Sequence, residues 1–187
     1  GSGTHVSQAL GAGNKKKADV YASTAFFTAF IAGIILAFFS LTNIDFIIRF
    51  LGSTETIAPY AKDYATYIFY AMPFMMCSFV MNNLLRFEGL TIYGMVGITT
   101  GGILNMVLDP IFIFALNMGT AGAALATALS QVVSFIILLV MCNTKEDALS
   151  IRFSNFKPSL QVYGSIFYNG IPSLGRQGIA SVSTILL

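Results

Sequence analysis

Charged residues are distributed very unevenly along this chain. No Asp, Glu, Lys or Arg occurs in residues 20–44 or 64–85, and residues 89–144 contain a single charge, Asp109. About 20 apolar residues in a helix cross the ~30 Å hydrocarbon core of a bilayer. The first two intervals are each long enough for one crossing, and the third is long enough for two. This spacing indicates a multi-pass membrane protein.

The composition supports the same class. The 187 residues are 56% hydrophobic and 10% charged, and the mean hydropathy is +0.76. Soluble domains carry roughly 25% charged residues, so most soluble enzymes and disordered chains are excluded. The net charge of +2 is too small to favour nucleic acid as a partner. Because no phosphate-binding Gly-Lys-Ser/Thr motif is found, we expect no cofactor, and an ion gradient has to supply any energy.

The fold class predicted from these intervals is an all-α transmembrane helical bundle. Polar and Gly residues at 117–122 divide the longest interval. Four complete helices are predicted at about 20–42, 63–86, 92–117 and 120–142, and a fifth begins near 164–170. The chain opens with GSGT and stops inside an apolar run. We interpret it as an incomplete fragment.

Loop charges predict the orientation in the membrane. The loops on one side carry seven cations, namely Lys15, Lys16, Lys17, Arg86, Lys145, Arg152 and Lys157. The loop on the other side carries two, Arg49 and Lys62. The positive-inside rule places the richer side in the cytoplasm. Loops 11–19, 86–91 and 143–163 are therefore expected to be cytoplasmic, and loop 43–62 faces outward. The expected location is the cell membrane, of the bacterial inner-membrane type.

The third and fourth predicted helices carry small residues suited to close packing. Gly97 and Gly101 are four residues apart, and Ala predominates in residues 121–128. Since lipid provides no hydrophobic force between helices, small residues allow them to associate by close approach. We expect these two helices to form a tight hairpin.

Asp109 is the most informative residue in the sequence. A carboxylate within a spanning helix is costly, and a functional role is the default hypothesis. Asn105 lies four residues earlier and so shares its helix face. Pro110 should free the carbonyl of residue 106, producing a kink and a further oxygen ligand. The alternative is that Asp109 and Pro110 are the N-cap and first residue of a restarted half-helix.

Depth in the membrane suggests partners on the next helix. At ~1.5 Å per residue, Asp109 lies about 15 Å and Thr127 about 12 Å from Gly119, so the two should be level. Gln131 should lie near the depth of Asn105. A carboxylate, an amide and a hydroxyl would then converge. Such oxygens suit a hard cation, and a buried acid can take up a proton, so the site could bind H⁺ or Na⁺.

The second helix carries polar and thioether groups on one face, including Met75, Ser78 and Asn82. Flexible thioethers suit a surface that accepts ligands of several shapes. The alternative is that Met fills space in the helix and Asn pairs across helices. Arg176 is the only charge in residues 159–187, and it either reaches the inner interface or faces a neighbouring helix.

Six segments occur in an order that resembles a known family: 7–14 (SQALGAGN), 72–74 (MPF), 82–89 (NNLLRFEG), 104–114 (LNMVLDPIFIF), 119–127 (GTAGAALAT) and 170–173 (GIPS). Together they resemble the MATE (multidrug and toxic compound extrusion) transporters. The resemblance implies twelve helices in two six-helix lobes, and a cavity that exports organic cations and other drugs in exchange for H⁺ or Na⁺. Residues 1–19 would be the end of helix two and a loop, 20–142 helices three to six, 143–163 the inter-lobe loop, and 164–187 the start of helix seven.

The resemblance also assigns roles to residues. One prokaryotic branch uses an Asn and an Asp four apart on helix five and a Thr on helix six, and Asn105, Asp109 and Thr127 match these. That branch adds an Asp on helix one, which this chain lacks together with most of the second lobe. Asn82, Met75 and Gln131 would line the drug cavity.

Two other functions remain open. A lipid-linked oligosaccharide flippase of the same superfamily would need a cationic cavity, for which only Arg176 is available. An intramembrane enzyme, or a helper subunit of one, could use Asp109 as an acid or base, although no second catalytic group accompanies it.

Overall fold

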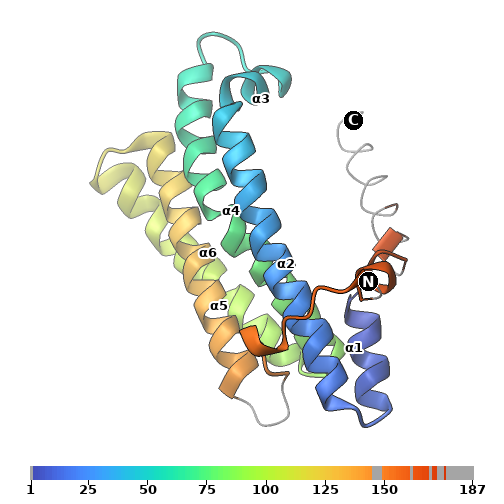
Figure 1. Ribbon diagram of the computed structural model, residues 1–187. Coiled ribbons are helices and arrows are strands. Elements are labelled where there is room, and N and C mark those ends of the chain that lie inside the picture. The colour runs from blue at the N-terminus through green and yellow to red at the C-terminus, as the bar shows by residue number, and fades with distance from the viewer. Residues whose placement is uncertain (1, 145–148, 161, 169, 172–174, 176–187) are drawn as a thin grey trace.

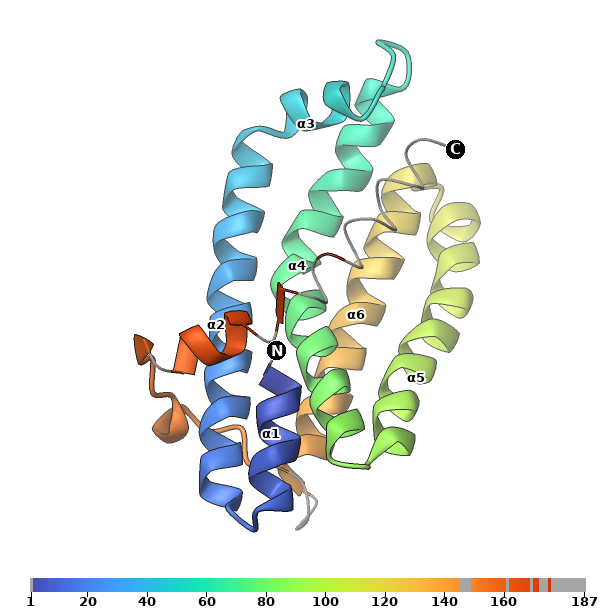
Figure 2. The ribbon, with the colours of Figure 1, turned by 90° about the vertical axis from the view of Figure 1, so that its right-hand side faces the viewer.

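A bundle of long helices forms the body of the computed structural model (Figure 1), which describes residues 2–144, 149–160, 162–168, 170, 171 and 175. The long helices are α2 (Lys15–Thr42), α4 (Ala58–Phe87), α5 (Thr91–Pro110) and α6 (Gly119–Thr144). Each runs antiparallel to the one before it, and α4 packs against the other three (Figure 2). The shorter helix α1 (Ser2–Gly11) lies beside the first turns of α2.

The four predicted spans are confirmed as helices. In the described part of the chain, four helices are long and apolar enough to cross a membrane. Two of them begin earlier than predicted, α2 at Lys15 and α4 at Ala58. Asn14 caps α2 by accepting a hydrogen bond from the Lys17 amide at 3.0 Å. At 1.5 Å per residue α2 is about 42 Å long, so its lysine end extends beyond the ~30 Å hydrocarbon core.

Glycines set the spacing of α5 against α6. A Cβ built on Gly97 would lie 2.5 Å from the Leu138 side chain, and one on Gly101 would lie 2.9 Å from Ser134 Cβ. The Ser134 hydroxyl donates to the Gly97 carbonyl at 2.9 Å. The expected tight hairpin is present, and these glycines meet the middle of α6. The Ala-rich start of α6 lies nearer the turn, where Gly122 meets the Phe112 backbone.

Buried side chains gather toward the end of the bundle where α1 lies. One cluster joins α1, α2, α4 and the chain after α6, and it contains Val6, Ala9, Ala18, Tyr21, Ala22, Leu84 and Leu149. The neighbouring cluster contains Phe26, Cys77, Met81, Leu85, Leu138, Cys142 and Ile151. The two buried clusters therefore fix one end of the bundle.

Residues 149–157, here called the strap, lie along this same end of the bundle. The Ser150 amide donates to Asp19 Oδ1 at 2.9 Å, and the Ser23 hydroxyl donates to the Ser150 carbonyl at 3.2 Å. The Lys157 amide donates to Thr24 Oγ1 at 3.4 Å. Because these bonds satisfy polar groups on an otherwise apolar helix, the strap forms an integral part of the fold. The sequence alone predicted only a loop here.

Three short elements were not predicted. Helix α3 (Ile44–Phe50) lies within the predicted loop 43–62, crosswise between the ends of α2 and α4 (Figure 2). After Pro110 the backbone continues into a π-helical turn, η1 (Ile111–Ala115). The turn predicted at 117–122 is found, with positive φ at Asn117 and Gly119. A 3₁₀ turn, η2 (Phe153–Asn155), lies within the strap.

Candidate functional site

Asn105, Asp109 and Thr127 form one hydrogen-bonded cluster between α5 and α6. The Asn105 amide nitrogen donates to Asp109 Oδ1 at 3.2 Å and to Thr127 Oγ1 at 3.3 Å. The Thr127 hydroxyl donates to the Ala123 carbonyl at 3.0 Å. The sequence predicted that Asp109 is level with Thr127. In the structure the bond to Thr127 comes from Asn105, one helical turn away.

Asp109 is half-buried and lies inside a candidate membrane span. The ion pair found among the described residues joins Lys62 and Asp45, so within that part of the chain no cation neutralises Asp109. Oδ2 of Asp109 and Oδ1 of Asn105 accept no hydrogen bond from any described residue. The cluster therefore presents oxygen atoms that could receive a cation or a proton.

The alternative role of Asp109 as a helix N-cap is not supported. Asp109 is within α5, which continues through Pro110 into η1, and no side chain caps η1. Instead of a restarted α-helix, the Leu116 amide bonds back to the Ile111 carbonyl at 3.0 Å, five residues earlier. Such π-helical turns within helices often occur at functional sites. Since proline has no N–H, the carbonyl of residue 106 lacks its usual helical donor.

A pocket of about 380 Å³ opens beside this cluster, between α4, α5 and α6. Its lining is largely apolar, with hydroxyl and amide groups from all three helices. The lining residues are Met75, Ser78, Phe79, Ile98, Gly101, Gly102, Asn105, Thr127, Ser130, Gln131 and Ser134. Asn105 and Thr127 thus belong both to the cluster and to the pocket wall.

Of the residues predicted to line a cavity, Met75 and Gln131 do so, and Asn82 does not. Asn82 is buried one turn farther along α4, where a Cβ on Gly94 would lie 2.7 Å from its amide nitrogen. The close approach of α5 at Gly94 closes the space at that level. Ser78 was predicted only to share a face with Met75, and Ser130 was missed. Both hydroxyls line the pocket, buried and without a partner among the described residues.

Glu88 is a second acidic group, to which the sequence analysis assigned no role. It follows the last residue of α4, and its Oε2 accepts a hydrogen bond from the Leu149 amide at 3.2 Å. Burial raises the pKa of Glu88 from 4.5 to about 7, which the hydrogen bond from Leu149 and the charge of Lys15 oppose and the charge of Asp19 reinforces. Glu88 therefore fastens the strap with a carboxyl group that titrates near neutral pH. Arg176 lies outside the described residues.

Comparisons with known proteins place the chain in a family. Residues 1–111 match the MatE family. Multidrug export protein MepA of Staphylococcus haemolyticus (strain JCSC1435) is 31% identical over 92% of this chain and 38% of its own length. The MepA of Staphylococcus saprophyticus (strain ATCC 15305) is 27% identical over 100% of this chain and 42% of its own length.

Solved structures agree with these relatives. A multidrug resistance MATE family transporter of the MOP superfamily, in its outward-facing conformation, aligns with a TM-score of 0.89 and 30% identity over 98% of this chain and 41% of its own. A multidrug resistance MATE family transporter in an inward-facing conformation aligns with a TM-score of 0.85 and 31% identity over 92% of this chain and 39% of its own. The chain thus spans about two fifths of the length of these relatives. It is a multi-pass membrane protein that belongs to the MATE family of transporters.

Proposed function

We propose that this chain is the N-lobe part of a multidrug efflux antiporter, which exports organic compounds, often cationic, in exchange for H⁺ or Na⁺. The observation that carries this proposal is the Asn105–Asp109–Thr127 cluster beside a pocket within the membrane span. The relatives are named multidrug export proteins. The complete transporter would add a first helix and a second lobe, for two lobes of six helices.

Asp109 is the group that would exchange the coupling ion. A carboxylate with no cation beside it, in the described part of the chain, has a strong preference for a proton or a metal cation in a medium of low dielectric constant. Asn105 and Thr127 would supply neutral oxygens, which hard cations such as Na⁺ accept alongside a carboxylate. Each time the ion leaves, the hydrogen bonds from Asn105 hold the site in place.

The pocket would receive the drug. Its volume of about 380 Å³ falls within the range of small-molecule sites. Met75 and Phe79 offer adaptable apolar contacts, and the hydroxyls of Ser78 and Ser130 offer hydrogen bonds. Because Asn105 and Thr127 belong to both sites, a bound ion changes the polarity of the pocket wall. This shared wall is a direct route for coupling ion binding to drug binding.

The orientation proposed from loop charge puts the strap and Glu88 in the cytoplasm and α3 outside.

The lining of the pocket bears on the two alternative functions. None of the described residues that line it is charged, which disfavours an oligosaccharide flippase that must hold a pyrophosphate. Asp109 has no second acid or base beside it in the described residues, which disfavours an intramembrane enzyme.

The experiment is gradient-driven drug export by the complete transporter in vesicles. Asp109→Asn should abolish export and leave membrane insertion unchanged, because it removes the charge and keeps the size of the side chain. Asp63→Asn is the matched control, since Asp63 is exposed at the start of α4 and its neutralisation should preserve export. Retained export by the Asp109→Asn protein would contradict the proposal.

A further inference from the structure

Helix α3 presents three different faces, although it is only seven residues long. Ile44 and Ile48 are buried against the bundle. On the opposite side Phe46 and Phe50 are 70% and 80% exposed, and their rings stack with centroids 6.2 Å apart. Asp45 and Arg49 lie between these faces, four residues apart. An amphipathic helix of this kind is typical of the boundary between membrane and water.

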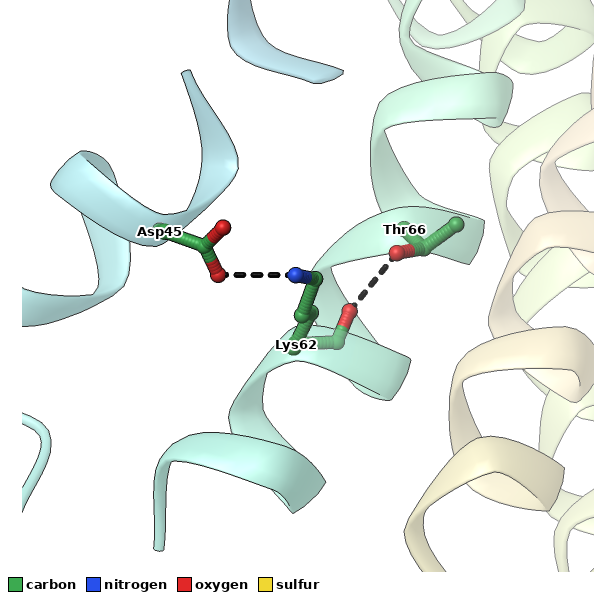
Figure 3. Close-up of polar contacts among 3 residues, drawn as sticks. All are labelled: Asp45, Lys62 and Thr66. Carbon is green, nitrogen blue, oxygen red and sulfur yellow. Dashed lines mark hydrogen bonds and ion pairs between the residues drawn. The ribbon is translucent and has the colours of Figure 1, made fainter. Parts of the chain in front are cut away.

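The charged face of α3 borders a pocket of about 420 Å³. Residues from α3, from the following loop and from the start of α4 line it, including Asp45, Arg49, Glu55 and Lys62. Lys62 Nζ pairs with Asp45 Oδ1 at 2.8 Å, and the Thr66 hydroxyl donates to the Lys62 carbonyl at 2.7 Å (Figure 3). The side chains of Arg49 and Glu55 have no hydrogen-bond or ion-pair partner among the described residues. The pocket thus retains one unpaired cation and one unpaired anion.

The sequence fixes the depth of this pocket in the bilayer. No charge occurs between Asp19 and Asp45 along α2 and α3, or between Asp63 and Arg86 along α4. Asp45 and Lys62 therefore mark the level at which the charge-free spans end. That is the level of the phospholipid headgroups, with the exposed Phe46 and Phe50 available to the acyl boundary.

We propose that this pocket binds the headgroup of a zwitterionic phospholipid with a primary ammonium group, namely phosphatidylethanolamine. The Arg49 guanidinium would bind the phosphate, for which its forked donors are suited. The Glu55 carboxylate would accept hydrogen bonds from the ammonium group. Phe46 and Phe50 would contact the upper parts of the acyl chains. The site does not depend on the proposed export function, and loop charge assigns it to the outer leaflet.

Charge complementarity selects this lipid over two others. The four charged groups sum to zero, so an anionic headgroup such as phosphatidylglycerol gains no net attraction. Phosphatidylcholine has the same charge, but its quaternary nitrogen has no N–H to donate to Glu55. Ethanolamine alone among the three satisfies both unpaired groups.

The test is native mass spectrometry of the complete transporter, released from nanodiscs that contain the three lipids in equal amounts. The protein should retain phosphatidylethanolamine over phosphatidylcholine by about tenfold, equivalent to about 1.4 kcal/mol. Arg49→Gln and Glu55→Gln should each remove this preference. Lys16→Gln is the matched control, because Lys16 is an exposed charge at the opposite end of α2 and its loss should leave the preference intact.

Equal retention of all three lipids by the unsubstituted protein would overturn the proposal. Preferred retention of phosphatidylglycerol would also overturn it and would identify an anionic-lipid site. Melting temperatures measured in parallel separate lost binding from lost folding. Should Arg49→Gln fail to fold, Glu55→Gln decides, since Glu55 is exposed and its substitution disturbs no packing. An unchanged lipid preference in the Glu55→Gln protein would contradict the assignment.

Discussion

Asn105 connects the members of the candidate ion site. Its amide nitrogen donates both to Asp109 and to Thr127, so a single side chain positions a carboxylate and a hydroxyl from two helices. Thr127 in turn donates to the Ala123 carbonyl, which leaves its lone pairs directed toward the cluster. The carboxylate and the hydroxyl are therefore held close together before any ion arrives. For Asn105 to offer its own oxygen to the ion, its amide group has to rotate.

Substitution of Thr127 tests whether its hydroxyl is part of the ion site. Thr127→Val keeps the shape and removes the oxygen, so the affinity for the coupling ion should fall about tenfold, as expected for the loss of about 1–1.5 kcal/mol. Thr127→Ser keeps the oxygen and should stay close to the unsubstituted protein. The measurement is the ion concentration that gives half-maximal export. Equal values for the Val and Ser proteins would exclude a ligand role.

For single residues, the sequence predicted which side chains meet, but it did not predict their relative levels along the two helices. The four-residue spacing and the count from the turn brought Asn105, Asp109 and Thr127 together correctly. The offset between Asp109 and Thr127 was not predictable, because interhelical register depends on side-chain packing. The unpartnered hydroxyl of Ser130 was also missed, since a lone Ser carries no pattern.

Among the four long helices, α5 has the least burial, and it contacts α6 closely at its glycines. Only 6% of its most apolar window is buried inside the structure, yet Gly97 and Gly101 bring it against α6. Its position depends on a few points where a side chain larger than hydrogen cannot fit. Of these two glycines, Gly101 also forms part of the pocket wall.

Gly101→Ala should therefore destabilise the pairing of α5 with α6. The added Cβ would lie 2.9 Å from Ser134 Cβ and 3.2 Å from the Ser130 carbonyl, and overpacking of this kind costs about 1–3 kcal/mol. Gly102→Ala is the control, because no atom lies within 4 Å of its added Cβ. Alanine forms helices better than glycine. Thermal melting should show a lower Tm for the first protein only; equal values would refute the close contact.

The contact of Glu88 with the strap should make the stability of the protein depend on pH. Because burial raises the pKa of Glu88 to about 7, the packed state binds a proton more tightly than the unfolded state does. The free energy of unfolding should therefore fall as the pH rises from 4.5 through about 7. Glu88→Gln should remove this dependence, and Glu55→Gln should not. Melting curves measured across this pH range check the sign. A Tm that rises with pH in the unsubstituted protein, and does not do so in the Glu88→Gln protein, would contradict it.

Helix α3 and the strap show where local sequence patterns no longer predict the structure. Helix α3 was predicted as part of a loop, because a segment of seven charged and aromatic residues is too short to show a helical period. The strap was missed because its contacts join residues more than 100 positions apart, such as Ser150 with Asp19 and Ser23. Charge-free length, by contrast, is a property of the sequence itself, and it identified all four spans.

At the scale of the whole molecule, the chain matches about two fifths of the length of its relatives. It aligns with an inward-facing structure at a TM-score of 0.85 and with an outward-facing structure at 0.89, both of MATE family transporters. Many apolar side chains are exposed, including Phe38, Phe79 and Met106. Such surface is suited to lipid or to further helices. The proposed ion site lies between two helices of this chain, α5 and α6.

The most direct measurement of the central claim is equilibrium ion binding to the purified complete transporter, by radioactive Na⁺ and by proton release at constant pH. Asp109→Asn should remove one bound Na⁺ or one exchangeable proton per molecule, whichever ion is used, because it deletes the charge that holds the ion. Asp63→Asn should bind like the unsubstituted protein. Full ion binding by the Asp109→Asn protein would show that the carboxylate in the membrane span does not hold the coupling ion.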